Sequence, residues 1–226
     1  MEVPYWKRLL SYLIDLRIES SASDHHQHLD IWLSRGRFQL CTENAVYSYE
    51  DLYENFGSLL KDKLTLEKLP GNQVLILGLG LGSIPIILDQ LSRDHWEFSA
   101  VEIDEEVCRL ANIYASPKIF SPLEVHVADA NIYLSLNQTS FDLICVDLFV
   151  DDQIPGEFKT EDFLMMLNQA LNPGGLIVFN TLAYRESDKT ESREFYNEVF
   201  KIVFEDGALV HVYRNYMLIN HRQYLR

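Results

Sequence analysis

The sequence predicts an α/β fold in which a small antiparallel β unit precedes a mostly parallel sheet with helices on both faces. After the first third of the chain, short apolar runs typical of buried strands alternate with helical patterns. Residues 29–42 alternate apolar and polar side chains around Gly36, which is typical of a β-hairpin. Residues 208–220 predict a second hairpin that finishes the main sheet. We therefore expect two units, residues 1–60 and residues 61–226.

The N-terminal unit begins with a predicted helix. Residues 5–16 place Trp6, Leu9 and Leu13 on one face, which predicts a short amphipathic helix packed on the body or on a partner chain. A strand near residues 16–20 is expected before the hairpin.

Two further segments of this unit carry polar groups. Residues 24–28 (DHHQH) contain three histidines in a Ser-rich connector without the i, i+4 pairing of a helical metal site, so we expect a polar loop and no metal ion. Residues 43–61 change to helical spacing. This predicts a helix that carries Tyr49 and Glu50 towards the mouth of the next unit.

The central stretch, residues 74–83 (VLILGLGLGS), predicts a buried strand that turns tightly into a helix. Such a turn lets backbone N–H groups and a helix N-terminus approach a ligand, so Gly78, Gly80 and Gly82 are candidate cofactor-binding residues. The dinucleotide fingerprint needs a further glycine at position 83, which is serine here. This argues against a nicotinamide cofactor.

Three later strands of the predicted sheet end in acidic residues. Glu102 ends the strand of residues 97–104, Asp129 follows the next, and Asp147 follows the third. In an open α/β sheet, ligands bind outside the carboxyl ends of the strands. Glu102 lies twenty residues after the glycine turn, where an acid accepts hydrogen bonds from both hydroxyls of a ribose. Asp104 is expected to cap the following helix.

The C-terminal half continues the alternation of helices and strands. We expect a helix over residues 159–171, a turn at residues 172–175 (NPGG) and a fifth strand over residues 176–181. Residues 185–193 read as a charged surface loop that leads into a helix.

Composition narrows the function classes. The formal charge is −15, with 34 acidic and 19 basic residues, which opposes binding to nucleic acid or to an anionic membrane and is compatible with a cationic substrate. No apolar run has the length of a membrane span, and the N-terminus lacks the pattern of a signal peptide, so we expect a cytoplasmic protein. The three cysteines lack metal or redox spacing and are expected to be buried.

The order of these motifs resembles the class I S-adenosylmethionine-dependent methyltransferase fold and, more narrowly, the spermidine synthase family. The resemblance covers roughly residues 29–181. It rests on five segments: QLCTENAVYSYEDL (39–52), VLILGLGLGS (74–83), VEIDEEV (101–107), VADA (127–130) and FDLICVDL (141–148). It implies a transferase of polyamine biosynthesis that uses S-adenosylmethionine or decarboxylated S-adenosylmethionine and a small amine.

The resemblance also implies residue roles on the donor side. Glu102 would hold the ribose hydroxyls. Asp129, with the backbone of Ala130, would recognise the adenine edge.

On the amine side, Asp147 matches the reactive-site aspartate of the family, which orients and deprotonates the attacking amine. Tyr49 would line the amine pocket, and Glu50 stands where the family has Gln or His. The second substrate-binding aspartate of the family is replaced ambiguously by Asp151 or Asp152.

One departure from the family leaves the reaction open. Leu81 stands where the family has an aspartate that grips the amine of the decarboxylated donor. Aminopropyl transfer is the family's reaction, methyl transfer from ordinary S-adenosylmethionine is the second hypothesis, and a catalytically weak nucleoside-binding module is the third. The family's N-terminal strands often contribute to dimers, so we expect a homodimer.

Overall fold

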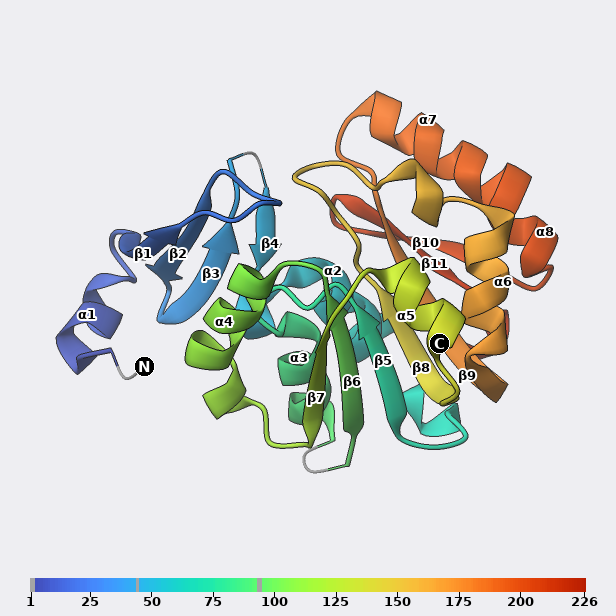
Figure 1. The fold of residues 1–226 in the computed structure, drawn as a ribbon, viewed down its shortest axis with the longest axis horizontal. Coiled ribbons are helices and arrows are strands. Elements are labelled where there is room, and N and C mark those ends of the chain that lie inside the picture. Colours follow the sequence, from blue (N-terminus) through green and yellow to red (C-terminus); the bar gives the residue numbers. More distant parts are fainter. Residues whose placement is uncertain (1–2, 44, 93–94) are drawn as a thin grey trace.

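The computed structural model describes residues 3–43, 45–92 and 95–226. Its strands form two sheets (Figure 1). The first sheet is antiparallel and follows chain order: β1 (Leu16–Ser21), β2 (Leu29–Ser34), β3 (Arg37–Cys41) and β4 (Val46–Ser48). Strands β2 and β3 are the predicted hairpin, and Arg35 and Gly36 adopt positive φ in its turn. Strand β4 is an addition to the prediction, since three residues are too few to show a clear alternation.

The second sheet has the order β10-β11-β9-β8-β5-β6-β7. Its members are β5 (Gln73–Leu77), β6 (Glu97–Glu102), β7 (Leu123–Val127), β8 (Phe141–Val146), β9 (Leu171–Leu182), β10 (Ala208–Val212) and β11 (Asn215–Ile219). Strands β5 to β9 are parallel, and the hairpin β10–β11 closes the sheet antiparallel to β9. The chain runs from β5 outward to β6 and β7 on one side, and later to β8 and β9 on the other. The strand order therefore reverses beside β5, where ligands bind in such sheets.

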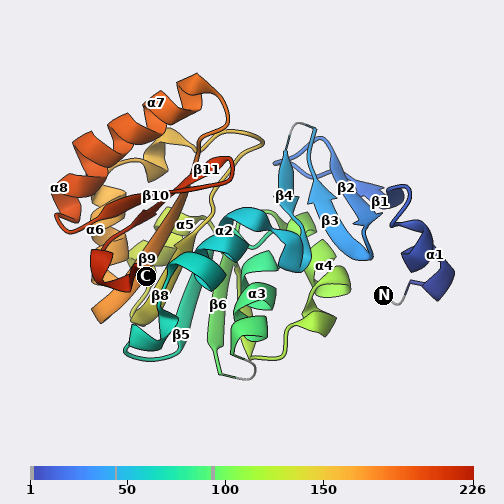
Figure 2. The same ribbon diagram turned by 180° about the vertical axis from the view of Figure 1, so that it is seen from behind.

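The helices cover both faces of this sheet, with α2 and α3 on one face and α5, α6 and α7 on the other (Figures 1 and 2). Their bounds are α1 (Tyr5–Leu10), α2 (Glu54–Ser58), α3 (Ser83–Leu91), α4 (Glu105–Tyr114), α5 (Ala130–Leu136), α6 (Glu161–Gln169), α7 (Glu186–Phe195) and α8 (Lys201–Val203). Among the described residues, no helix is long and apolar enough to cross a membrane.

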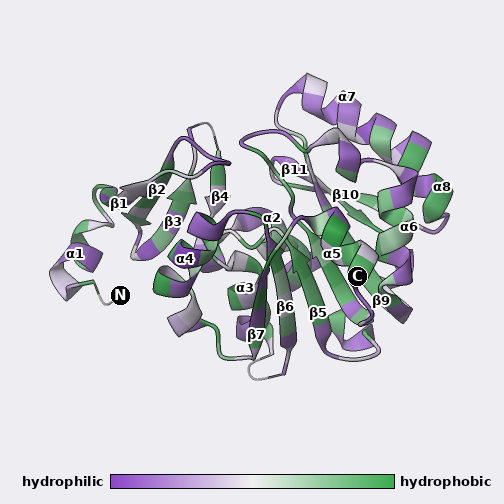
Figure 3. Ribbon diagram, viewed as in Figure 1, coloured by the Kyte–Doolittle hydropathy of each residue, from purple (hydrophilic) through white to green (hydrophobic). Residues whose placement is uncertain are grey.

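Strand β5 shows how one apolar run builds both layers. Side chains alternate across a strand. Val74 and Ile76 therefore pack under α2 and α3, while Leu75 and Leu77 pack in the opposite layer. Hydrophobic residues gather along these central strands, whereas α7 is largely hydrophilic (Figure 3).

The N-terminal sheet has its own apolar contact with the main unit. Ile31 and Leu33 on β2 pack with Val107 and Leu110 of α4. Leu81, in the turn after β5, is fully buried in this cluster. The contact holds the small sheet beside the carboxyl-end edge of the large one (Figure 2).

The predicted N-terminal helix is shorter than expected and does not pack on the body. Helix α1 ends at Leu10, and the predicted apolar face is exposed, with Trp6 at 60% and Leu13 at 83% of their full accessibility. This face therefore does not pack on the body, and packing on a partner chain, the other expectation, stays a prediction.

Three other expectations need correction. The helix predicted over residues 43–61 is broken into a 3-10 turn (Glu50–Leu52), α2 and a π-helical turn (Leu59–Lys63). Most of the predicted loop 185–193 belongs to α7, because the N–H of Arg185 donates to Asp188 and starts the helix. Residues 172–175 lie within β9, next to a register shift against β8, rather than in a free turn.

Candidate active site

A cavity of about 830 Å³ opens at the carboxyl ends of β5, β6, β8 and β9. The N-terminal sheet and the β10–β11 turn supply further parts of its wall. Among the described residues, its lining contains nine carboxylates and three guanidinium groups: Asp15, Glu54, Glu102, Asp129, Asp147, Asp151, Asp152, Glu157 and Asp188, against Arg35, Arg185 and Arg214. Excess negative charge in a cleft attracts cationic ligands.

The glycine turn after β5 forms one wall of the cavity. Gly78 has φ +91°, and a Cβ there would lie 2.2 Å from the carbonyl oxygen of Asp147. Gly80 has φ +51°, and its Cβ would lie 3.1 Å from that of Ser48. Both positions therefore require glycine, and both line the cavity as predicted.

Gly82 lies outside the lining of this cavity, and its role in cofactor binding stays a prediction. It has φ +69° at the start of α3, and an added Cβ would meet the side chains of Ile119 and Ala115. It therefore serves the packing of the turn against the segment that follows α4.

Glu102 lies at the cavity wall beside the glycine turn. Its Oε2 accepts the N–H of Leu79 at 3.1 Å and of Gly80 at 3.5 Å, and its Oε1 accepts the N–H of Asp104 at 3.2 Å. Burial raises the pKa of Glu102 above its ordinary value, although these hydrogen bonds act in the opposite direction. The carboxylate is thus fixed where the sequence predicts a ribose partner.

Asp129 and Ala130 also line the cavity. Asp129 caps α5, and its Oδ1 accepts the N–H of Ile132 at 3.0 Å. The structure therefore places both predicted adenine-site residues at one helix N-terminus on the cavity wall.

Asp147 follows β8 and has both carboxylate oxygens held. The hydroxyl of Tyr53 donates to Oδ2 at 2.9 Å, and Asn180 Nδ2 donates to Oδ1 at 2.8 Å. Asn215 Nδ2 donates in turn to Asn180 Oδ1 at 2.8 Å. Burial raises the pKa of Asp147 to about 6, the bonds from Asn180 and Tyr53 lower it, and the charge of Glu102 adds to the rise. A carboxylate with this pKa is suited to accept a proton near neutral pH.

Tyr53, Asn180 and Asn215 are site residues that sequence reasoning missed. Asn180 stands near the carboxyl end of a strand, so the rule that found Asp147 could have found it too. Tyr53 and Asn215 carry no such signal, because tertiary packing brings them from the segment before α2 and from the last hairpin.

The two predicted substrate residues that follow β4, Tyr49 and Glu50, lie in different surroundings. Tyr49 lines the cavity, and its hydroxyl donates to Ser34 Oγ at 3.0 Å. Glu50 lies outside the cavity lining, so the structure does not bring it to the cavity wall with Tyr49, and its substrate role stays a prediction. With φ +42°, its buried side chain turns to accept the N–H of Phe38 at 2.5 Å and to pair with Lys118.

Asp151 and Asp152 form the centre of a tight turn at the cavity wall. Val150 and Gln153 pair across this turn through two backbone hydrogen bonds of 2.8 and 3.1 Å. Thr42 Oγ1 donates to Asp151 Oδ1 at 2.7 Å. Arg185 Nη1 lies 3.2 Å from Asp152 Oδ2. The turn is therefore held from the N-terminal sheet on one side and from α7 on the other.

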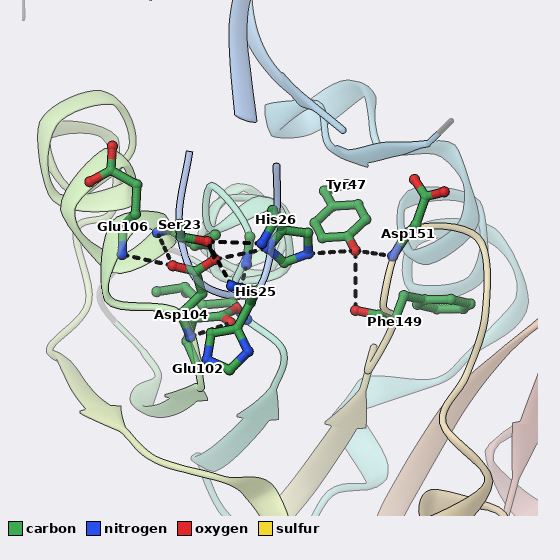
Figure 4. A network of polar contacts seen from close by, with 12 residues as sticks. Ser23, His25, His26, Tyr47, Glu102, Asp104, Glu106, Phe149 and Asp151 are labelled. Carbon is green, nitrogen blue, oxygen red and sulfur yellow. Dashed lines mark hydrogen bonds and ion pairs between the residues drawn. The ribbon is translucent and has the colours of Figure 1, made fainter. Parts of the chain in front are cut away.

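The histidine-rich loop joins a polar network at the same wall (Figure 4). His26 lies between Asp104 and the hydroxyl of Tyr47, at 2.8 and 2.9 Å. Asp104 caps α4 as predicted, by accepting the N–H groups of Glu106 and Val107. Across residues 3–43, 45–92 and 95–226, no group of three or more His, Cys, Asp or Glu side chains is placed to hold a metal ion.

A family model described as the spermine/spermidine synthase domain matches residues 63–217, more than half of the chain. The chain belongs to this family. A polyamine aminopropyltransferase of Vibrio vulnificus is 34% identical over 148 residues, which cover 61% of this chain and 48% of the relative. The chain thus spans about half the length of that curated relative.

Solved spermidine synthases share the fold. The enzyme of Thermotoga maritima superposes with a TM-score of 0.68 and 18% identity, over 90% of this chain and 71% of the other. A spermidine synthase in complex with the transition-state analogue AdoDATO gives a TM-score of 0.66 at 18% identity, over 90% and 71% of the two chains. The likeness confirms the predicted α/β sheet with its C-terminal hairpin.

Proposed function

We propose that the protein is a transferase that moves an aminopropyl group from decarboxylated S-adenosylmethionine to a small amine. The observation that carries this proposal is Asp147, whose carboxylate is held by two neutral donors in an acid-lined cavity and has its pKa raised by burial to about 6. The family and its curated aminopropyltransferases support the choice of reaction.

The donor would lie along the glycine turn. Gly78 and Gly80 bring the backbone of this turn to the cavity wall. We assign the ribose hydroxyls to the fixed carboxylate of Glu102, and the adenine edge to Asp129 with the backbone of Ala130. A spermidine synthase of the same fold binds AdoDATO, which supports a nucleoside in this position.

Asp147 would act on the amine. A primary amine near neutral pH is an ammonium ion, and its nitrogen has no free electron pair until a proton leaves. Asp147 accepts that proton. The amine nitrogen then bonds to the carbon next to the sulfonium, the carbon–sulfur bond breaks, and its electron pair stays on sulfur. The carboxylates around the cavity stabilise the positive charge that moves to nitrogen.

The remaining amine-site assignments are part of the proposal. Tyr49 would line the path of the acceptor. Asp151 and Asp152 would face the end of the acceptor remote from the reacting nitrogen, because both lie on the cavity wall.

Methyl transfer from ordinary S-adenosylmethionine is the second candidate, and Leu81 is the observation that favours it. Its side chain is fully buried against the N-terminal sheet and offers no charge to the amine of a decarboxylated donor.

Calorimetric binding of both donors, with Glu102→Ala and Asp129→Ala as control variants, tests the proposal. We expect the decarboxylated donor to bind at least about tenfold more tightly, and each variant to weaken binding, because each removes a charged hydrogen-bond partner worth about 1.5–3 kcal/mol. Preference for ordinary S-adenosylmethionine would move the assignment to methyl transfer. Binding of neither donor would overturn the nucleoside site itself.

We further propose that the protein acts in polyamine biosynthesis in the cytoplasm, as a homodimer. The exposed side chains of α1 and the residues after it are the apolar surface that supports association: Tyr5, Trp6, Leu9, Tyr12, Leu13 and Ile14. Light scattering at micromolar concentration should give the mass of two chains. A single-chain mass there would contradict the dimer.

A further inference from the structure

Three side chains, Asp104, His26 and Tyr47, form a relay from the start of α4 to the turn after β8 (Figure 4). His26 Nδ1 lies 2.8 Å from Asp104 Oδ2, and its Nε2 lies 2.9 Å from the Tyr47 hydroxyl. The same hydroxyl accepts the N–H of Asp151 and lies 3.3 Å from the carbonyl oxygen of Phe149. The relay thus ends on two backbone groups of the segment that follows Asp147.

The inner end of the relay is fixed. The side chains of Asp104 and His26 keep 1% and 8% of their accessibility. Burial acts to raise the pKa of Asp104, but hydrogen bonds from Ser23, His26 and the backbone outweigh it and hold the pKa below its ordinary value. Asp104 is therefore a carboxylate, which only accepts, so His26 Nδ1 carries the hydrogen.

The outer end of the relay is also defined. Burial raises the pKa of Tyr47 well above its ordinary value, so its hydroxyl keeps its proton. The ring centroids of His26 and Tyr47 lie 5.2 Å apart in an edge-to-face arrangement, which adds to the hydrogen bond in fixing the orientation of the two rings.

The segment that the relay holds is backbone-strained. Asp151 has φ +55°, a left-handed conformation that residues other than glycine adopt uncommonly and that its surroundings support here. Here Tyr47 contacts the N–H of Asp151, and Thr42 contacts its carboxylate. The turn therefore depends on the N-terminal sheet for its shape.

We propose that His26 and Tyr47 are positioning residues that fix residues 150–153 at the cavity wall and thereby set where the Asp151 carboxylate meets the acceptor. Neither residue takes part in the proton transfer at Asp147. The kinetic consequence of this proposal rests on the proposed function, whereas the structural consequence does not.

Tyr47→Phe is the direct test, because it keeps the ring and removes the hydroxyl that accepts the N–H of Asp151. We expect the KM for the acceptor amine to rise about tenfold, with kcat changed less than about threefold and donor affinity unchanged. His26→Asn should also raise the KM for the acceptor amine, since asparagine can still reach Asp104 but is too short to support Tyr47. Tyr114→Phe is the matched control, because its hydroxyl bonds Glu19 at 2.5 Å outside the cavity wall.

Hydrogen exchange of residues 148–153 gives a readout that needs no turnover. In Tyr47→Phe and His26→Asn, but not in Tyr114→Phe, these amides should exchange about tenfold faster than in the wild type. Unchanged exchange in both relay variants would overturn the proposal. An inactive wild type with faster exchange in both variants would refute the proposed function and still support the relay. An equal rise of acceptor KM in the control would also overturn the specific role of the relay.

Discussion

Removal of the Tyr53 hydroxyl should change the pH dependence of the proposed reaction. This hydroxyl donates to Asp147 Oδ2 at 2.9 Å and favours the charged carboxylate. In Tyr53→Phe, burial would continue to disfavour that charge with one donor fewer to oppose it. The pKa of Asp147 should therefore rise above its present value of about 6.

The size of this change follows from the contact that is lost. A hydrogen bond to a charged group contributes about 1.5–3 kcal/mol, and water that enters at the position of the lost hydroxyl recovers part of it. A net loss of about 1.4 kcal/mol corresponds to a pKa higher by about one. The acidic limb of kcat/KM should move by the same amount towards higher pH, because it reports the essential base of the free enzyme.

A pH profile of kcat/KM between about pH 5 and 9 measures this effect. Tyr196→Phe is the matched control, since its hydroxyl donates to the carbonyl of Gly207 at 2.9 Å and lies outside the cavity. The control should keep the acidic limb of the wild type. A Tyr53→Phe profile that falls uniformly, without movement of the limb, would refute the assignment of Asp147 as the base.

Two predictions concern stability. Asp147→Asn should be more stable than the wild type at pH 7. Folding raises the pKa of the wild-type carboxyl from 3.8 to about 6. The protonated carboxyl therefore stabilises the fold fully below pH 3.8, and this contribution is lost as the pH rises through about 6. The pKa difference of about two sets an upper limit of about 3 kcal/mol, and we expect about 1–2 kcal/mol because the group faces a water-accessible cavity. Urea unfolding at pH 7 and at pH 4 checks this, and an equal advantage at both pH values would contradict it. Lys118→Met should lower the free energy of unfolding by about 2–3 kcal/mol, because it removes the nearer ion-pair partner of the buried Glu50 carboxylate and leaves only Arg37 Nε at 3.9 Å. Double substitution with Glu50→Gln should restore part of that loss in thermal unfolding, and an additive loss would contradict the pairing.

The hydrophobic pattern of the sequence was sufficient to predict the main sheet. Apolar runs and glycine turns predict its strands, and the rule for strand ends places Glu102, Asp129 and Asp147 at one cavity. These inferences hold because strand direction and helix crossover leave few alternatives in a parallel sheet. The division at residue 60 stays a prediction.

The features that the sequence did not predict share a physical origin. The positive φ of Glu50 and the packing around Gly82 cannot be predicted from residue types alone. Tyr53 reaches Asp147 only after α2 has packed on the sheet. His26 lies in the expected polar loop, but its burial beside Asp104 depends on the fold of β1 and β2 against α4.

The most direct test of the central claim is product formation by the wild type and by Asp147→Asn, measured by mass spectrometry with decarboxylated S-adenosylmethionine and a panel of small primary amines. We expect the wild type to form an aminopropylated amine and the variant to lose at least about a hundredfold in rate, because general base catalysis contributes about 10²–10⁴-fold. Donor affinity should stay the same in both proteins. Equal rates in wild type and variant, or a bound donor with no product from any amine, would contradict the account.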